Sequence, residues 1–444
     1  MARHPFEFDP AQTEAILSWA AERIKAGQDP RHGAMSKELL DPVLGGSITA
    51  AGLGAEAAFA LFTDGIVPAT RPFADPTSLS FVASAPSQAA LSFDAALGAA
   101  SIFAGNWDGG AGAIHAENQT LRWLADLAGW PETAGGVFVA GGTLGNLSAL
   151  HAARAWHRRQ TGQSGGGAIL CSREAHSSIA AVARVMDADL ILVEADDTGR
   201  MDAAAARAHL TPATFAIVAN GGATNCGAVD DLAGLTELGQ TQGIWVHVDG
   251  AYGGAALADP EMKNAFQGIE NAHSFIVDPH KWLFSPYDSC ALIYRDARDG
   301  AAAHGQRAVY LDTVDSDAWN PSDYALHLTR RARGLPLWYA LASHGTDAFR
   351  QAIRQTREIA EEIALGIQAH DGLDLLLGPQ LTVILFKPRS ASDAEMIAWA
   401  ESNRRSGALL CLPSKWRGEL VFRLCIVNPQ TDPAHVLRVL SGIR

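Results

Sequence analysis

Residues 245–254 read WVHVDGAYGG, an apolar run that ends in an acid and then in small residues. Similar apolar runs recur between residues 136 and 295, and segments of helical character separate them. They are GVFVAG (136–141), AILCS (168–172), LILVEA (190–195), FAIVANGG (215–222), FIVDP (275–279) and ALIYR (291–295). Nearly continuous apolar strands that alternate with helices indicate a parallel sheet covered on both faces. The sequence therefore predicts an α/β fold.

Polar residues cluster where these runs end. Asp249 ends the run at 245–249, and Asp278, His280 and Lys281 follow the run at 275–277. Open α/β sheets bind ligands beyond the carboxyl ends of their strands. We therefore expect a ligand site at this edge of the predicted sheet.

Lys281 lies between two apolar segments, although lysine is among the side chains least often buried. In apolar surroundings its amine would have a lowered pKa and become a nucleophile able to form a Schiff base. The alternative is a lysine whose stem packs on Trp282 while its head reaches solvent. The neighbouring motifs favour the first interpretation.

Two of these motifs point to a bound cofactor. Asp249, at a strand end 32 residues before Lys281, can hold a pyridine nitrogen in its protonated form, as expected for pyridoxal phosphate. The stretch VAGGTLGN (139–146) joins a strand to a helix through small residues. Backbone N–H groups and a helix N-terminus favour a phosphate there. In combination, these features predict a pyridoxal phosphate site.

Five motifs carry a family resemblance: GGTLGN (141–146), EAHSS (174–178), HVDGAYGG (247–254), DPHKW (278–282) and LTRRARGLPLW (328–338). In this order they resemble the group II pyridoxal-phosphate-dependent amino acid decarboxylases, the family of aromatic-L-amino-acid and glutamate decarboxylases. The resemblance covers roughly residues 73–427. It implies the PLP-dependent transferase fold type I, with a large domain built on a mostly parallel sheet, a smaller C-terminal α+β domain and an N-terminal helical arm.

The expected limits of these parts are residues 1–72 for the arm, 73–330 for the large PLP-binding domain and 331–444 for the small domain. In the small domain, LTVILFKP (381–388) and ELVFRLCIV (419–427) are predicted strands. Helices are predicted over 325–341, 350–369 and 433–440, and near the N-terminus over 11–24 after an Asp9-Pro10 start signal.

The resemblance implies a role for each matching position. Lys281 carries the cofactor, Asp249 pairs with the pyridine nitrogen and His176 stacks on the ring. The remaining cofactor contacts that it implies are Gly142, Thr143, Thr224, Ala251 and His280. Taken alone, His176 would be a capping or solvated residue and Thr224 could close a turn.

Two further positions bear on the chemistry. Tyr310 matches the tyrosine that returns a proton to Cα after CO2 leaves, and this favours an amine over an aldehyde as the product. Its alternative role is to pin a loop to the surface. Asp278 is a departure, because better-known eukaryotic members carry Asn there, and an anion beside a phosphate puts that contact in doubt. The alternative role for Asp278 is to orient a neighbouring residue.

The substrate is less well specified. Phe81, Phe103 and Trp107 could face an aromatic ring, although Phe103 and Trp107 could equally be core aromatics. We predict decarboxylation of an aromatic L-amino acid to the amine and CO2. The alternatives are an acidic or diamino acid (glutamate, aspartate or 2,4-diaminobutyrate), an aldehyde synthase or another carbon–carbon lyase. A relative that has lost catalysis and serves as a binding partner is the alternative outside enzymes.

Composition limits the partners. The formal net charge is −14 and no basic run with interleaved aromatics occurs, so nucleic acid is not expected as a partner. No signal peptide or membrane span is expected, and we predict a cytoplasmic protein. The five cysteines are widely spaced, so we expect buried free thiols and no metal site. The resemblance implies a homodimer with active sites at the interface.

Overall fold

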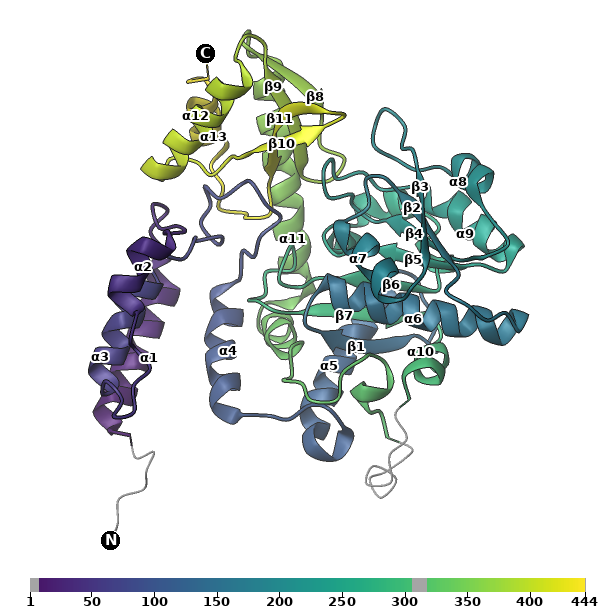
Figure 1. Cartoon of the computed structure of the whole chain (residues 1–444), viewed down its shortest axis with the longest axis horizontal. Coiled ribbons are helices and arrows are strands. Elements are labelled where there is room, and N and C mark those ends of the chain that lie inside the picture. Colours follow the sequence, from purple (N-terminus) through teal and green to yellow (C-terminus); the bar gives the residue numbers. More distant parts are fainter. Residues whose placement is uncertain (1–7, 306–317, 444) are drawn as a thin grey trace.

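The fold of this computed structural model centres on a seven-stranded sheet; the residues described are 8–305 and 318–443. The strands lie in the order β1-β7-β6-β5-β4-β2-β3 (Figure 1). Their bounds are Gly135–Val139 (β1), Ala168–Ser172 (β2), Asp189–Val193 (β3), Thr214–Asn220 (β4), Trp245–Asp249 (β5), Ser274–Val277 (β6) and Cys290–Tyr294 (β7). Each predicted run in this part of the chain is therefore a strand.

One strand departs from the expected parallel arrangement. Strands β2 to β6 pair in parallel, but β7 pairs antiparallel with both β1 and β6. Because β7 is antiparallel to both neighbours, β1 runs in the same direction as β6. The carboxyl ends of β1, β4, β5 and β6 therefore share one edge of the sheet, as the sequence predicts.

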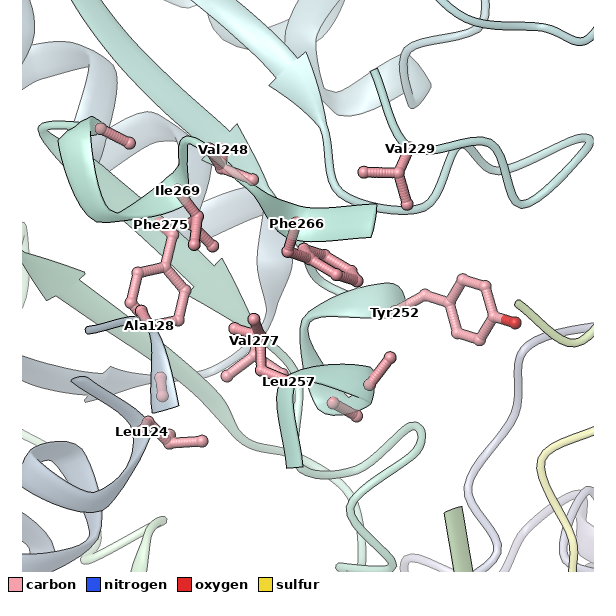
Figure 2. Close-up of a cluster of buried hydrophobic side chains, with 14 of the residues drawn as sticks. Leu124, Ala128, Val229, Val248, Tyr252, Leu257, Phe266, Ile269, Phe275 and Val277 are labelled. Carbon is pink, nitrogen blue, oxygen red and sulfur yellow. The ribbon is translucent and has the colours of Figure 1, made fainter. Parts of the chain in front are cut away.

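Alternate residues of each strand point to opposite faces of the sheet, and both faces are buried beneath helices. Val137, Val139 and Ile169 belong to one buried cluster, which packs against α6 and α7, whereas Phe138 and Leu170 belong to another. Figure 2 shows part of the second cluster, which includes Val248, Phe266, Phe275 and Val277. The helices that follow the strands are α6 (Gly142–Thr161), α7 (Ser177–Val185), α8 (Ala203–His209), α9 (Leu232–Gln242) and α10 (Ala297–His304).

The N-terminal helices lie to one side of this body (Figure 1). They are α1 (Pro10–Ala26), α2 (Lys37–Leu44) and α3 (Ala55–Leu61), and α4 (Gln88–Ala100) and α5 (Trp107–Leu127) lead into the sheet. The Asp9 side chain accepts a hydrogen bond from the Ala11 N–H and caps α1, as predicted. None of α1, α2 and α3 contains a fully buried residue.

A second, antiparallel sheet lies near the C-terminus, in the order β10-β11-β9-β8. Its strands are β8 (Leu373–Leu377), β9 (Val383–Pro388), β10 (Pro413–Trp416) and β11 (Glu419–Cys425), with α12 (Asp393–Ser406) and α13 (Pro433–Leu440) beside it. The helix predicted over 325–341 is wrong in its first half, because α11 (Leu335–Gln368) begins only after Gly334. The domain limits 1–72, 73–330 and 331–444 stay predictions.

The long helix α11 belongs to both cores and is kinked at Gly345. Its N-terminal residues Leu337 and Ala340 pack in the cluster beneath the large sheet. Ile359 and Ile363, farther along, pack against the smaller sheet. Among the described residues, no helix combines the length and the apolar character needed to cross a membrane.

Candidate active site

A cavity of about 720 Å³ opens at the shared edge of the large sheet. The ends of β4, β5 and β6, the start of α6 and one residue of the smaller sheet form its wall. Of the sequence-predicted site residues, it brings together Phe81, Gly142, Thr143, His176, Thr224, Asp249, Ala251, His280 and Lys281.

Lys281 sits in the wall with 24% of its side chain exposed, while Trp282 and Leu283 after it are fully buried. Its Nζ lies 3.1 Å from Asp278 Oδ2. Burial lowers the pKa of Lys281, but the carboxylates of Asp278 and Asp249 and the Asp278 hydrogen bond raise it, and the net shift is upward. The expectation of a lowered pKa is therefore wrong for the side chain as it stands here, because two buried anions face the amine.

Asp278 orients this lysine. Its carboxylate is 2% exposed, and its Oδ2 also lies 3.8 Å from His280 Nε2. Oδ1 is buried and has no hydrogen-bond partner among the described residues. Burial lowers the pKa of His280, and Lys281 adds to this, against the opposing effect of Asp278. Neutral His280 and cationic Lys281 therefore face one carboxylate.

Asp249 ends β5 directly beside Asn220, the last residue of β4. Asp249 is 7% exposed; its Oδ1 accepts from the Ala251 N–H at 3.2 Å and its Oδ2 from Asn146 Nδ2 at 2.9 Å. The carboxylate is thus fixed from two sides. Asn220 is 2% exposed, and its Nδ2 is buried with no hydrogen-bond partner in the described structure.

The start of α6 contributes backbone donors. The first N–H groups of a helix have no partner within it, so Gly142 and Thr143 present theirs at the cavity wall. Space is tight here: a Cβ added to Gly142 would lie 3.2 Å from Asp278 Oδ2 and 3.3 Å from the Ala251 Cβ. A residue larger than glycine would therefore crowd this part of the wall, beside the helix N-terminus that favours an anion.

His176 and Thr224 lie in the same wall. His176 is the N-cap of α7, and its Nδ1 lies 2.9 Å from Ser178 Oγ and 3.2 Å from the Ser178 N–H. The capping role that we expected from its local sequence is therefore present, and it coexists with a place at the cavity. The Thr224 carbonyl accepts from Arg423 Nη1 at 2.9 Å.

Sequence reasoning missed Asn146, Asn220 and Arg423. Arg423 comes from β11 in the smaller sheet; its Nη2 donates to the Ser80 carbonyl at 2.9 Å, and its buried Nε has no partner among the described atoms. A guanidinium within the apolar strand ELVFRLC was the available signal, since charged residues are rarely buried without a reason. Asn146 lies in the motif GGTLGN, of which only the glycine and the threonine were assigned a role, and Asn220 lies in the run FAIVANGG, which was interpreted only as a strand.

Of the three residues predicted to contact the substrate, one lines the cavity and two do not. Phe81 lines the cavity and is 41% exposed. Phe103 and Trp107 are not among the lining residues of this chain's cavity; Trp107 packs instead on a small cluster that contains Ala332 and Leu335. Tyr310 belongs to residues 306–317 and lies outside the described residues.

The sequence model described as "Pyridoxal-dependent decarboxylase conserved domain" matches residues 62–389, well over half of the chain. The chain belongs to this family. The decarboxylase is accordingly a pyridoxal-phosphate-dependent carboxy-lyase that acts on an amino acid. The family resemblance predicted from the motifs is confirmed.

Curated relatives carry more than one substrate name. The decarboxylase is 28% identical over 362 residues to an aromatic-L-amino-acid decarboxylase of Bacillus atrophaeus, with 77% of this chain and 75% of the relative covered. It is 32% identical over 355 residues to an L-2,4-diaminobutyrate decarboxylase of Rhizobium meliloti, with 76% and 71% covered. The names support an amino acid decarboxylase and leave the amino acid open.

Solved structures agree on the fold. The crystal structure of Oryza sativa TDC with PLP and tryptamine has a TM-score of 0.90 at 21% identity and covers 100% of this chain and 98% of that chain. The glutamate decarboxylase domain of diaminobutyrate-pyruvate transaminase and L-2,4-diaminobutyrate decarboxylase from Vibrio parahaemolyticus has a TM-score of 0.83 at 24% identity, with 99% of this chain and 96% of that chain covered. The predicted fold type I is therefore confirmed.

The cavity fits pyridoxal phosphate. The cofactor needs an amine for its aldehyde, an anion for its ring nitrogen and donors for its phosphate. Lys281, Asp249 and the start of α6 offer these groups in one cavity. The Nδ2 of Asn220, which is buried and has no hydrogen-bond partner in the described part of the chain, is a further donor in the same wall.

Proposed function

We propose that the decarboxylase holds pyridoxal phosphate covalently on Lys281 and removes the α-carboxyl group of an aromatic L-amino acid. The observation that carries this proposal is that Lys281 and Asp249, 32 positions apart in the sequence, line one cavity together with the N-terminus of α6. In this proposal His176 lies on the ring face, Ala251 on the opposite face and Thr224 at the ring edge. Gly142, Thr143 and His280 contact the phosphate.

Bound pyridoxal phosphate supplies an electron sink for the electron pair that remains at Cα when CO2 leaves. Lys281 must lose a proton before its amine can act as a nucleophile. Asp278 Oδ2 lies at 3.1 Å, within hydrogen-bond distance, and can accept that proton. With the cofactor bound, the negative charge of Asp249 would stabilise a protonated ring nitrogen, and the hydrogen bonds to its two oxygens hold the carboxylate in position.

Arg423 is proposed to orient the substrate's α-carboxylate. It brings a guanidinium from the smaller sheet to the cavity wall, and its buried Nε is without a partner among the described atoms. Its Nη1 and Nη2 are fixed by the Thr224 and Ser80 carbonyls, so the charge is held in one place. A fixed cation that directs the carboxylate selects which bond at Cα breaks.

The proposed aromatic substrate is supported by the cavity's apolar side. Phe81, Val82 and Tyr287 line it, and Phe81 and Tyr287 are among the more exposed large side chains. Aromatic rings bind well against such surfaces. The name of the Bacillus atrophaeus relative agrees with this choice.

The second candidate substrate is 2,4-diaminobutyrate. The Rhizobium meliloti relative that carries this name is 32% identical, and Asp288 places a carboxylate in the cavity wall that could pair with a side-chain ammonium. Asp288, however, already forms an ion pair with Arg333. The engaged carboxylate makes the aromatic substrate the stronger proposal.

CO2 release from a panel of L-amino acids tests the function. Tryptophan, tyrosine and phenylalanine are compared with 2,4-diaminobutyrate, glutamate and aspartate, and peroxide is measured alongside to detect aldehyde formation. Lys281→Ala should lose both the yellow cofactor absorbance and CO2 release, while the exposed Lys415→Ala should keep both. Colour that survives in Lys281→Ala would remove that lysine from the proposal, and preference for 2,4-diaminobutyrate would replace the aromatic substrate.

We also propose a cytoplasmic homodimer with its active sites at the interface. The arm formed by α1 to α3 exposes large apolar side chains, among them Leu17, Leu39 and Val43, and none of the residues within these three helices is fully buried. A second copy is the commonest cover for such a face. Phe103 and Trp107, which lie away from the cavity of their own chain, would then be available to the partner. Light scattering should give twice the chain mass of 46.8 kDa, and a monomer would contradict the proposal.

A further inference from the structure

We propose that Asn146 is the positioning residue of this site, whose single amide fixes both the Asp249 carboxylate and the proton on His176. The inference rests on the proposed function, in which Asp249 faces the cofactor's ring nitrogen and His176 its ring face. It adds a chain of buried side chains that runs from the cavity wall into the sheet.

Asn146 lies in the second turn of α6 and is 1% exposed. Its amide is fully used: Nδ2 donates to Asp249 Oδ2 at 2.9 Å and to Ser178 Oγ at 3.0 Å, and Oδ1 lies 2.9 Å from His247 Nε2. Three elements, β5, α7 and α6, therefore meet at one side chain. A buried amide with every donor and acceptor engaged has one orientation.

Chemistry fixes the direction of each bond. An ionised carboxylate only accepts, so the amide nitrogen of Asn146 must face Asp249 and its oxygen must face His247. His247 Nε2 therefore carries a proton. His247 Nδ1 then accepts from the Ser274 hydroxyl at 2.8 Å, which in turn accepts from Trp245 Nε1 at 2.9 Å.

The protonation state of His247 agrees with this assignment. It is fully buried at the centre of β5. Burial lowers the pKa of His247 to about 4, although Asp249 opposes the effect. The ring is therefore neutral near pH 7, with a single proton that the hydrogen bonds place on Nε2.

The other amide proton of Asn146 reaches His176. Ser178 Oγ accepts from Asn146, so its own proton is free to go to His176 Nδ1 at 2.9 Å. The Ser178 backbone N–H also donates to that atom, at 3.2 Å. His176 Nδ1 is thus an acceptor twice over, and a neutral His176 carries its proton on Nε2.

One side chain consequently aligns two groups that come from different helices and strands. Among the described hydrogen bonds, removing its amide would leave the Asp249 carboxylate held only by the Ala251 N–H, and it would free the Ser178 hydroxyl to turn away, so that His176 Nδ1 keeps only the Ser178 backbone N–H. Both changes act after the substrate has bound, because Asn146 contributes position and not apolar contact. The rate constant kcat should therefore fall more than KM rises.

The test compares three holoenzyme variants. Asn146→Leu keeps the volume and removes all three hydrogen bonds. Asn146→Asp keeps the shape but can donate to Asp249 only when its carboxyl is protonated. Asn428→Leu is the matched control: Asn428 is also buried, and its Nδ2 donates to the Ala74 carbonyl at 3.0 Å, outside this network. Each variant is measured for kcat and KM, and the bound cofactor's visible absorbance is titrated with pH.

We expect Asn146→Leu to lower kcat by about 10- to 100-fold, as for lost hydrogen bonds to charged groups, with KM within about twofold. The pH at which the cofactor absorbance changes should move, and Asn428→Leu should leave it in place. Asn146→Asp should regain kcat relative to wild type as the pH falls, since protonation restores the donor. A merely structural role would give no such recovery.

Wild-type kcat and an unmoved absorbance titration in Asn146→Leu would overturn the inference. If that variant fails to fold, Ser274→Ala gives the answer, because Ser274 lies outside the cavity lining and reaches this network through His247, although its hydroxyl also accepts from Trp245 Nε1. It should shift the titration in the same direction by a smaller amount, and no shift would refute the network. Cofactor colour in Lys281→Ala would instead refute the proposed function, so the two failures are distinct.

Discussion

Breaking the buried ion pair between Glu117 and Arg330 should destabilise the decarboxylase strongly. Arg330 Nη2 donates to both carboxylate oxygens, at 2.6 and 2.7 Å, and the Gly334 N–H before α11 donates to Oε1 at 2.8 Å. The side chains are 2% and 3% exposed. The pair joins α5 to the start of α11, and Arg330 Nη1 also donates to the Ala104 carbonyl at 2.8 Å.

Glu117→Gln keeps the shape and removes the charge, so a buried guanidinium is left without its counter-ion. Breaking one partner of such a pair costs about 3–5 kcal/mol. Counting the two hydrogen bonds from Arg330 at about 1.5–3 kcal/mol each gives a similar range. Glu117→Gln together with Arg330→Met removes both charges, and the double variant should be more stable than the sum of the single losses predicts.

Urea unfolding, followed by tryptophan fluorescence, measures these differences in the free energy of unfolding. The control is Asp374→Asn, which breaks an exposed pair with Arg389 whose side chains are both 53% exposed. That loss should be about 0–1 kcal/mol. If Glu117→Gln falls within the range of the control, or if the single losses simply add, the pair does not hold α5 and α11 together.

Three further predictions concern acid, thiols and the phosphate space. Burial lowers the pKa of His247, His273, His304 and His327 from 6.5 to about 4. The unfolded chain then binds more protons than the folded chain, so stability should fall as the pH falls from about 6.5 to about 4. Burial also raises the pKa of Asp230 to about 7, which acts in the opposite direction but is one group against four. A Tm that does not decrease over this range would contradict the prediction. The five cysteines are buried, and burial raises the pKa of Cys171 and Cys226 to about 12, so a thiol reagent should label the chain only after unfolding. Rapid labelling of the folded protein would show that this burial is wrong. Gly142→Ala should weaken pyridoxal phosphate binding by about tenfold or more, because the added Cβ crowds Asp278 and Ala251, whereas Gly98→Ala has open space around it. Equal cofactor affinities in a titration of the two variants would be the contrary result.

The large sheet was predictable because its strands are buried on both faces and so appear as continuous apolar runs. The antiparallel direction of β7 was not predictable, since an apolar run does not indicate whether a strand is parallel or antiparallel to its neighbours. Strands β8 and β10 were not predicted from the sequence, for a different reason. They are edge strands of the smaller sheet, and exposed positions break their apolar pattern. The capping box of Ser392 and Glu395 is a sequence signal for the start of α12, a helix that was not among the predicted elements.

The candidate site was predictable where a residue type alone signals the chemistry, as for Lys281 and Asp249. Contacts between distant segments were not. Asn146 forms a hydrogen bond with Asp249, 103 positions away in the sequence, and Arg423 forms one with Thr224, 199 positions away. The raised pKa of Lys281 depends on the direction of the Asp278 side chain, which no local pattern specifies. The reading of Asp278 as a residue that orients its neighbour agrees with its 3.1 Å contact to Lys281.

The helix α11 sets a limit on how this chain can be divided. Its first turns complete the interior beneath the large sheet, and its later turns complete that of the small one. A fragment cut before Leu335 would lack part of its own interior, and a fragment that begins there would carry Leu337 and Ala340 uncovered. Attempts to express either lobe separately should therefore yield insoluble material, and laboratory dissection of the enzyme should leave this helix whole.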